Sequence, residues 1–164
     1  MTIVEACESK TNTTPEFPMG WYSVARSSEL LVGEVKSVQA FDRELVLYRT
    51  RSGVPVIQDA YCPHLGAHLG VKGRVVGESI RCPFHGWRYG TDGMCEHIPY
   101  SDEIPDRARL RTWHCEEKNG EVYIWFHREN TGPQWELPSL PELGHPDWTS
   151  PRYTEFLVPA HVQD

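Results

Sequence analysis

The chain has 164 residues, which is the length of one domain with a short extension. With 39% hydrophobic and 24% charged residues, its composition allows a buried core and excludes a chain that is disordered throughout. Sixteen basic and 23 acidic residues give a formal net charge of −7 at pH 7. This balance argues against a nucleic-acid binder, because few cations are available to neutralise phosphates.

Cysteine content and the start of the chain bear on its compartment. The first eight residues are acidic and resemble neither a secretory signal nor a transit peptide. Because no apolar run is long enough to span a bilayer, we expect no transmembrane segment and a cytoplasmic protein. Five cysteines, an odd number, then indicate thiol or metal chemistry rather than a disulfide framework.

The first part of the chain predicts a lead-in followed by short strands. Residues 1–16 are polar, and we interpret them as a flexible lead-in. Order is expected to begin near Phe17. From there the sequence predicts several short strands, of which Glu34–Ala40 alternates apolar and polar residues as a half-buried strand does. The predicted strands are Trp21–Ala25, Glu34–Ala40, Glu44–Thr50, Val54–Ala60 and Val75–Arg81.

The strongest hairpin pattern lies further along the chain. Leu110–Glu117 and Glu121–Phe126 flank Lys118–Gly120, and the Asn-Gly pair in this turn readily adopts positive φ angles. Arg51–Gly53 is a second predicted hairpin turn. Short strands at this spacing, with 13 Gly and 13 Pro in the chain, predict an all-β fold. We expect a small antiparallel sandwich or barrel.

Composition changes after His127. Residues 128–160 contain six prolines, which exclude a long helix. A linker is one interpretation, whereas the aromatic residues in this stretch favour an arm that packs on another surface. The predicted organisation is therefore a lead-in over residues 1–16, a domain over 17–127 and a Pro-rich extension over 128–164.

Two segments of similar sequence carry the candidate chemistry. They are Cys62-Pro-His64-Leu-Gly66 and Cys82-Pro-Phe-His85-Gly86-Trp87. In each, Pro follows Cys directly, a His comes soon after, and a Gly lies near the His. Pro restricts such a loop before a metal binds, and Gly lets the backbone come close to the bound group. Two thiols and two imidazoles on paired loops predict a metal centre.

Zinc is the main alternative to iron at such a centre. Zinc sites commonly take two Cys from one loop and two His from another, or use a Cys-x-x-Cys knuckle. Here each loop supplies one Cys and one His, which suits a two-iron cluster with both thiolates on one iron and both imidazoles on the other. A Cys–His nucleophilic pair would not need the duplication.

This spacing resembles that of Rieske [2Fe–2S] domains, which have Cys-x-His in one loop and Cys-x-x-His in the next. The resemblance covers about residues 17–127. It implies that Cys62 and Cys82 hold the buried iron, and that His64 and His85 hold the outer iron near the surface. Trp87 is expected to shield the cluster, and the resemblance implies that Pro99 belongs to a covering segment.

Among Rieske proteins, the chain is similar to the sterol branch of the oxygenases, the cholesterol 7-desaturases and ketosteroid 9-hydroxylases. Asp59–Gly70, Cys82–Trp87 and Cys95–Tyr100 carry this resemblance. Respiratory Rieske proteins have an additional Cys in each loop, where this chain has Ala67 and Phe84. The respiratory type also has a Ser that is hydrogen-bonded to a cluster sulfur, near the position of Trp87 in this chain. Because fewer donors to the sulfurs stabilise the reduced cluster less, we expect a reduction potential of roughly −150 mV, at the low end of the Rieske range.

The resemblance implies a function in electron transfer. A reductase or ferredoxin would reduce the cluster, which would pass electrons to mononuclear Fe(II) in an oxygenase catalytic domain, usually that of a neighbouring subunit. The reaction would be an O₂-dependent hydroxylation or desaturation, with a sterol-like substrate. The sequence shows no two-histidine, one-carboxylate triad for that iron.

The segment that ends at Asp164 resembles the opening of the family's catalytic domain. We therefore expect the N-terminal part of an oxygenase, with the catalytic domain absent from this chain, and whether the chain alone is an enzyme stays open. A stand-alone Rieske ferredoxin, a zinc-bound interaction module and a non-catalytic regulatory fragment are the alternatives.

The remaining cysteines and His68 are not expected to bind the metal centre. Cys95 and Cys115 are expected to be free thiols. His68 is expected to be a surface residue, because its offset of four from His64 fits no Rieske pattern. Cys7 lies in the lead-in and is given no function.

Overall fold

The computed structural model describes residues 17–154, 156 and 158. The lead-in predicted over residues 1–16 therefore lies outside the described residues, as does most of the end of the extension. Apart from a short 3-10 turn at Ser27–Glu29, the regular elements of the described part are antiparallel β-strands. The predicted all-β fold is confirmed.

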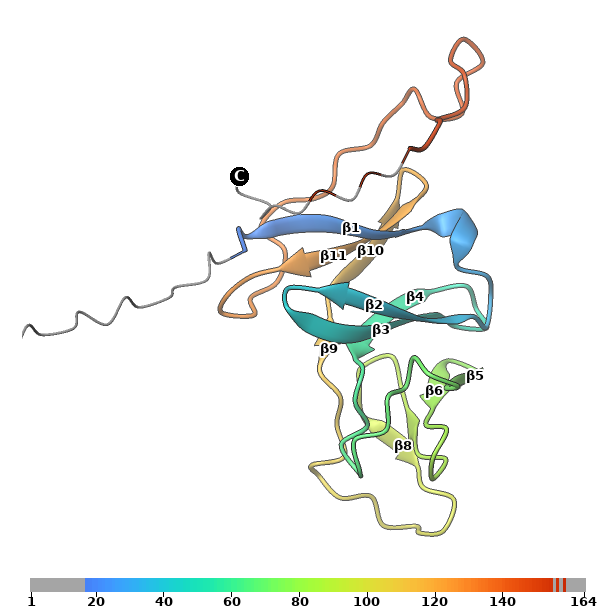
Figure 1. Cartoon of the computed structure of the whole chain (residues 1–164), viewed down its shortest axis with the longest axis vertical. Coiled ribbons are helices and arrows are strands. Elements are labelled where there is room, and N and C mark those ends of the chain that lie inside the picture. Colours follow the sequence, from blue (N-terminus) through green and yellow to red (C-terminus); the bar gives the residue numbers. More distant parts are fainter. Residues whose placement is uncertain (1–16, 155, 157, 159–164) are drawn as a thin grey trace, which may run out of the picture.

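The strands form three sheets, two of them in one half of the molecule (Figure 1). The first sheet has the order β1-β11-β10, and the second has the order β2-β3-β4-β9. The strands of the first sheet are β1 (Gly20–Arg26), β11 (Glu121–Phe126) and β10 (Cys115–Lys118). Those of the second sheet are β2 (Val35–Ala40), β3 (Arg43–Arg49), β4 (Pro55–Asp59) and β9 (Thr112–Trp113).

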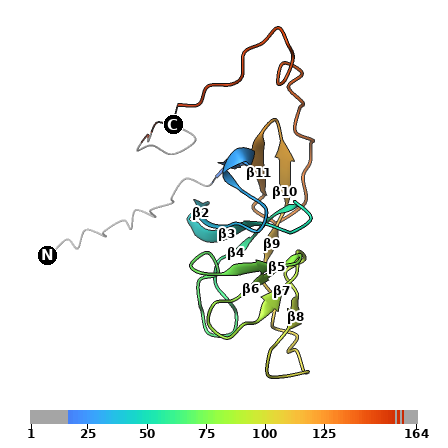
Figure 2. The same cartoon turned by 90° about the vertical axis from the view of Figure 1, so that its right-hand side faces the viewer.

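The third sheet lies at the opposite end of the molecule, with the two Cys–His loops beside it (Figures 1 and 2). Its order is β5-β6-β7-β8. The strands are β5 (Arg74–Val76), β6 (Ser79–Arg81), β7 (Arg88–Tyr89) and β8 (Cys95–His97).

The first four predicted strands are confirmed as β1 to β4, each end within one residue of its expected position. The single strand predicted over Val75–Arg81 is wrong, because the chain reverses at Gly77, which has φ +62°, and forms the β5–β6 hairpin. The strand predicted over Leu110–Glu117 is divided between two sheets. Its first part, β9, pairs with β4, whereas β10 pairs with β11.

Two tight turns contain non-glycine residues with left-handed backbone. The predicted Asn119–Gly120 turn is confirmed, with φ angles of +55° and +82°. Phe41 and Asp42, between β2 and β3, both have φ +55°. Left-handed geometry costs roughly 1–2 kcal/mol per such residue. The Phe41 ring offsets this cost because it is buried among aromatic neighbours, with the Phe126 centroid 4.4 Å away.

Buried side chains form two clusters. One fills the space between the first two sheets and includes Leu47, Trp113 and Ile124. The other joins β3 to the third sheet, and Cys62 and Cys82 are among its members. Both predicted Cys–His loops therefore start from the packed core.

The start of the Pro-rich extension packs on the first sheet. Trp135 meets Trp125 edge to face, with ring centroids 4.7 Å apart, and Leu137 is buried. Further along the extension, Trp148 and Phe156 are exposed. The interpretation of the extension as an arm therefore fits its first part, which contacts this same chain.

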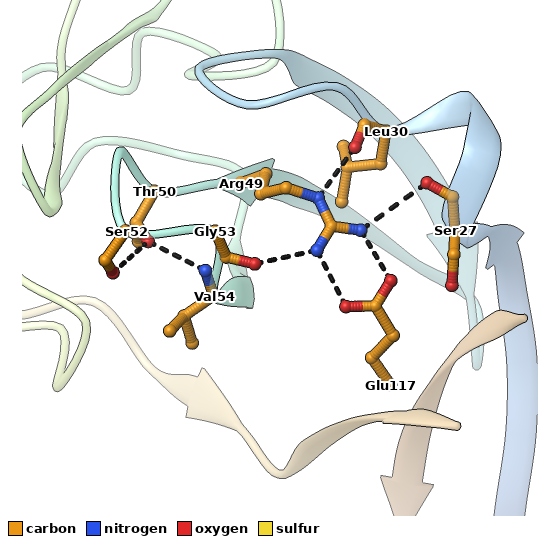
Figure 3. A network of polar contacts seen from close by, with 8 residues as sticks. All are labelled: Ser27, Leu30, Arg49, Thr50, Ser52, Gly53, Val54 and Glu117. Carbon is orange, nitrogen blue, oxygen red and sulfur yellow. Dashed lines mark hydrogen bonds and ion pairs between the residues drawn. The ribbon is translucent and has the colours of Figure 1, made fainter.

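A partly buried ion pair joins the first sheet to the second (Figure 3). Arg49 on β3 donates from Nη1 and Nη2 to the two carboxylate oxygens of Glu117 on β10, at 2.7 Å each. Its Nε donates to the Leu30 carbonyl, and Nη1 also donates to the Gly53 carbonyl, both at 2.7 Å. Such bidentate, charge-assisted bonds fix geometry as well as adding energy.

Replacing Arg49 by methionine is predicted to lower the free energy of unfolding by about 3 kcal/mol, because it leaves a partly buried carboxylate and two carbonyls without a donor. Urea unfolding measures this change. Arg26→Met is the control, since the Arg26–Glu29 pair is exposed and is expected to contribute less than about 1 kcal/mol. Equal losses for the two variants would contradict the assignment.

The same pair predicts a pH dependence of stability. The hydrogen bond from Arg49 lowers the pKa of Glu117 below its ordinary value of 4.5. The pair's contribution is therefore fully present above pH 4.5 and is lost as the pH falls through the lower folded value. The stability difference between wild type and Glu117→Gln should shrink between pH 7 and about pH 3 in urea unfolding. A constant difference would show that the carboxylate charge does not matter.

Candidate metal centre

The two Cys–His loops are closed by the same backbone hydrogen bonds. In the first, the Cys62 N–H donates to the Ala67 carbonyl and the Gly66 N–H donates to the Cys62 carbonyl, at 2.9 and 2.8 Å. The second loop repeats both bonds at the same offsets from Cys82, at 2.8 and 3.2 Å. The glycine four residues after each Cys is left-handed, with φ of +71° and +76°. Other residues adopt this geometry at a cost, which explains the glycines.

The loops bring the four predicted ligand residues together as two pairs at different depths. Cys62 and Cys82 are each 2% exposed, and their side chains are hydrogen-bonded to each other. His64 and His85 are half-buried, with ring centroids 4.7 Å apart. The sulfurs therefore lie inside and the imidazoles lie outside. This is the order expected for a cluster with one buried and one outer iron.

The two thiols shift each other's pKa. The neighbouring Cys82 thiol lowers the pKa of Cys62, and the Tyr89 hydroxyl, 3.1 Å from Cys62 Sγ, adds to this effect. The Cys62 thiol in turn raises the pKa of Cys82. A metal bound here would place positive charge beside both sulfurs and take them as thiolates.

One imidazole nitrogen lacks a partner. His64 Nδ1 is buried and has no hydrogen bond, and the ring stacks on the Trp87 indole at 4.4 Å with an interplanar angle of 6°. A buried polar atom without a partner costs free energy. Coordination to a metal ion would satisfy this nitrogen. Two paired thiols, two paired rings and this nitrogen thus fit a cluster of two iron ions.

Tyr89 is a member of the site that the sequence analysis did not single out. Its side chain is fully buried, and its hydroxyl contacts Cys62 Sγ. Burial raises the pKa of Tyr89, so it stays neutral and donates. In the sequence, Tyr89 is marked only by its position two residues after Trp87, just beyond the second loop.

The two predicted shielding residues both contact the loops. Trp87 is 8% exposed and covers the His64 ring. Its Nε1 donates to the Tyr100 hydroxyl at 2.7 Å. Pro99 Cγ lies 3.0 Å from the place that a Cβ on Gly86 would occupy, so this proline rests directly on the second loop.

The remaining candidates lie apart from this arrangement. His68 Nδ1 accepts a hydrogen bond from the Gly70 N–H at 3.1 Å, and its ring meets the Tyr61 ring. Cys95 and Cys115 form no disulfide, and burial raises the pKa of Cys115 to about 12. Over residues 17–154, 156 and 158, no three His, Cys, Asp or Glu side chains gather around one point for a single metal ion. In that part of the chain, no helix has the length and apolar character needed to cross a membrane.

Known proteins share both the sequence and the fold of this chain. Cholesterol 7-desaturase nvd 1 of Ciona intestinalis is 41% identical over 92% of this chain and 32% of its own length. The oxygenase component of 3-ketosteroid-9-alpha-monooxygenase of Rhodococcus rhodochrous is 37% identical over 87% of this chain and 37% of its own length. This chain thus spans about a third of the length of these relatives.

Among solved structures, dicamba monooxygenase bound to dicamba has a TM-score of 0.65 and 26% identity over 78% of this chain and 38% of its own. NdmA of Pseudomonas putida CBB5 has a TM-score of 0.64 and 28% identity over 77% of this chain and 39% of its own. The expected resemblance to desaturases and ketosteroid oxygenases is confirmed. Residues 20–114 match the model of the Rieske [2Fe–2S] domain, and the chain belongs to that family.

Proposed function

We propose that this chain carries electrons through a [2Fe–2S] cluster held by Cys62, His64, Cys82 and His85. The observation that carries this proposal is the pairing of two buried sulfurs below two half-buried rings, with His64 Nδ1 lacking any other partner. The two thiolates would bind the inner iron and the two imidazoles the outer one. When bound, the cluster supplies a centre that takes up and releases one electron.

The rings provide the route between the cluster and a partner. His64 and His85 are the half-buried members of the site, so an electron would pass through them rather than through the sulfurs, which are 2% exposed. An imidazole bound through one nitrogen keeps the other for a hydrogen bond to a partner. Trp87 and Pro99 would shield the cluster from water, since they cover His64 and Gly86.

The names of the relatives suggest where the electron comes from and where it goes. A reductase or ferredoxin would donate the electron, and mononuclear Fe(II) in an oxygenase catalytic domain, in the same or a neighbouring subunit, would accept it. Cholesterol 7-desaturases and a ketosteroid monooxygenase favour a sterol-like substrate and O₂-dependent desaturation or hydroxylation. We also propose that the protein is located in the cytoplasm.

The domain limits also belong to this proposal. Residues 17–127 would form the electron-transfer domain, preceded by the lead-in. Residues 128–164 would lead toward the catalytic domain. Packing of Trp135 on the first sheet, and the hydrogen bond from Lys118 Nζ on β10 to the Leu137 carbonyl, support an extension that leaves this domain in a fixed direction.

Ligand substitutions test the cluster directly. Cys82→Ser and His85→Ala should each abolish cluster assembly, because each leaves one iron with a single protein ligand. Iron, acid-labile sulfide and the visible spectrum of the purified chain measure the result. His68→Ala is the matched control and should keep all three, since His68 is hydrogen-bonded elsewhere. Bleaching in the control would show that the ligand set is wrong, and zinc without sulfide in the wild type would select a zinc module.

Removing the Tyr89 hydroxyl should lower the reduction potential. Its hydrogen bond to Cys62 Sγ stabilises the reduced, more negative cluster more than the oxidised one. A difference of about 1 kcal/mol corresponds to roughly 40 mV for one electron. The reduction potential of Tyr89→Phe should therefore lie about 40 mV below that of the wild type in a spectroscopic redox titration.

Tyr48→Phe is the matched control for this titration. Tyr48 is fully buried in the same cluster of side chains, but its hydroxyl has no hydrogen-bond partner. Its removal should leave the potential unchanged. Equal shifts in both variants would mean that burial, and not the bond to sulfur, sets the effect of Tyr89.

A further inference from the structure

Three arginines lie side by side across the third sheet. Arg74 on β5 is directly opposite Arg81 on β6, and Arg81 is directly opposite Arg88 on β7. Side chains at directly opposite positions leave the sheet on the same face, and like charges placed in this way destabilise it. The row therefore lowers the stability of the sheet, which points to a use outside the fold.

No ion pair neutralises this row in the described part of the chain. Within residues 17–154, 156 and 158, none involves Arg74, Arg81, Arg88 or the nearby Lys72. The carboxylates of Glu78 and Glu96, on the same sheet and its first turn, accept hydrogen bonds from serine hydroxyls. The whole chain has a net charge of −7, so the row is a local exception to its overall charge.

The cations stand beside the second Cys–His loop. Lys72, Arg74 and Arg81 line an open cavity of about 550 Å³ together with Cys82 and His85, and none of its lining residues is acidic. The Arg81 guanidinium lies 3.1 Å from the place that a Cβ on Gly86 would occupy, so it rests against the loop itself.

Exposed aromatic side chains complete the same surface. Phe84 and Tyr100 line this cavity and are 63% and 62% exposed. Aromatic rings surrounded by cations are typical of the composition of protein interfaces. A protein partner therefore fits this surface better than a small ion does, because a small ion would leave the rings uncovered.

We propose that Lys72, Arg74 and Arg81, with Phe84 and Tyr100, form the docking surface for an acidic redox protein that exchanges electrons with the cluster. This inference rests on the proposed electron-transfer function. Surface carboxylates of the partner would pair with the three cations, and the opposite charges would speed encounter. Docking here would place the partner against His85, which lines the same cavity.

The test measures electron transfer from the dithionite-reduced chain to plastocyanin, an acidic copper protein. One electron leaves the cluster and reduces Cu(II) to Cu(I), and no other bond changes. In stopped-flow at about 10 mM ionic strength, Arg74→Gln/Arg81→Gln should slow the second-order reaction about tenfold. The difference should vanish at about 0.5 M salt, where charges are screened.

Two further measurements separate docking from a structural role. The melting temperature of Arg74→Gln/Arg81→Gln should stay equal or rise, because like-charge repulsion is removed. Its affinity for plastocyanin, followed by nuclear magnetic resonance titration of the oxidised proteins, should fall with the rate. The control Arg43→Gln/Arg152→Gln removes two exposed charges outside the cavity and should leave rate and affinity within about twofold.

Several outcomes would overturn the docking proposal. Equal slowing in the control would mean that only net charge matters, and unchanged rates in Arg74→Gln/Arg81→Gln would mean that plastocyanin docks elsewhere. Loss of the wild-type rate with inorganic phosphate at constant ionic strength would indicate a small-anion site. If the double variant fails to assemble a cluster, Lys72→Gln carries the test, with an expected slowing of about threefold. A wild type without a Rieske spectrum would instead reject the proposed function.

Discussion

Two sulfurs inside and two imidazoles outside are the constraint on which this structure depends. Both loops close with the same backbone bonds, and both use a left-handed glycine four residues after the cysteine. The two histidines follow their cysteines by two and three residues, and their ring centroids lie 4.7 Å apart. The arrangement leaves His64 Nδ1 buried without a partner. Such a site is incomplete as protein alone, and a pair of iron ions would complete it.

The rest of the domain holds these loops in place. The cluster of side chains that contains Cys62 and Cys82 also contains residues of β3 and of the third sheet, so the loops are anchored from two directions. Tyr89 reaches Cys62 from β7, and Trp87 covers His64. Far from the loops, the Arg49–Glu117 pair joins the first two sheets (Figure 3). The stability of this scaffold and the chemistry of the site therefore use separate interactions.

Local patterns made the loops and the first strands predictable. The Cys, Pro, His and Gly positions lie within six residues of one another in each loop, and strands β1 to β4 have five to seven residues each. The third sheet was harder to predict because its strands have two or three residues, too few for a period to show. The division of Leu110–Glu117 between two sheets depends on the pairing of β9 with β4, which is distant in the sequence. The Gly77 turn closes a local hairpin, but its two strands have only three residues each. Tyr89 was not predicted as part of the site because its contact with Cys62 joins residues that are 27 positions apart in the sequence.

Pulsed electron paramagnetic resonance of the dithionite-reduced chain tests the central claim most directly. The account predicts a Rieske-type signal with hyperfine couplings from two imidazole nitrogens, one from His64 and one from His85. In a sample in which only histidine carries ¹⁵N, both couplings should change to those of the heavier isotope. A cluster signal without nitrogen coupling, or with coupling to only one histidine, would contradict the account.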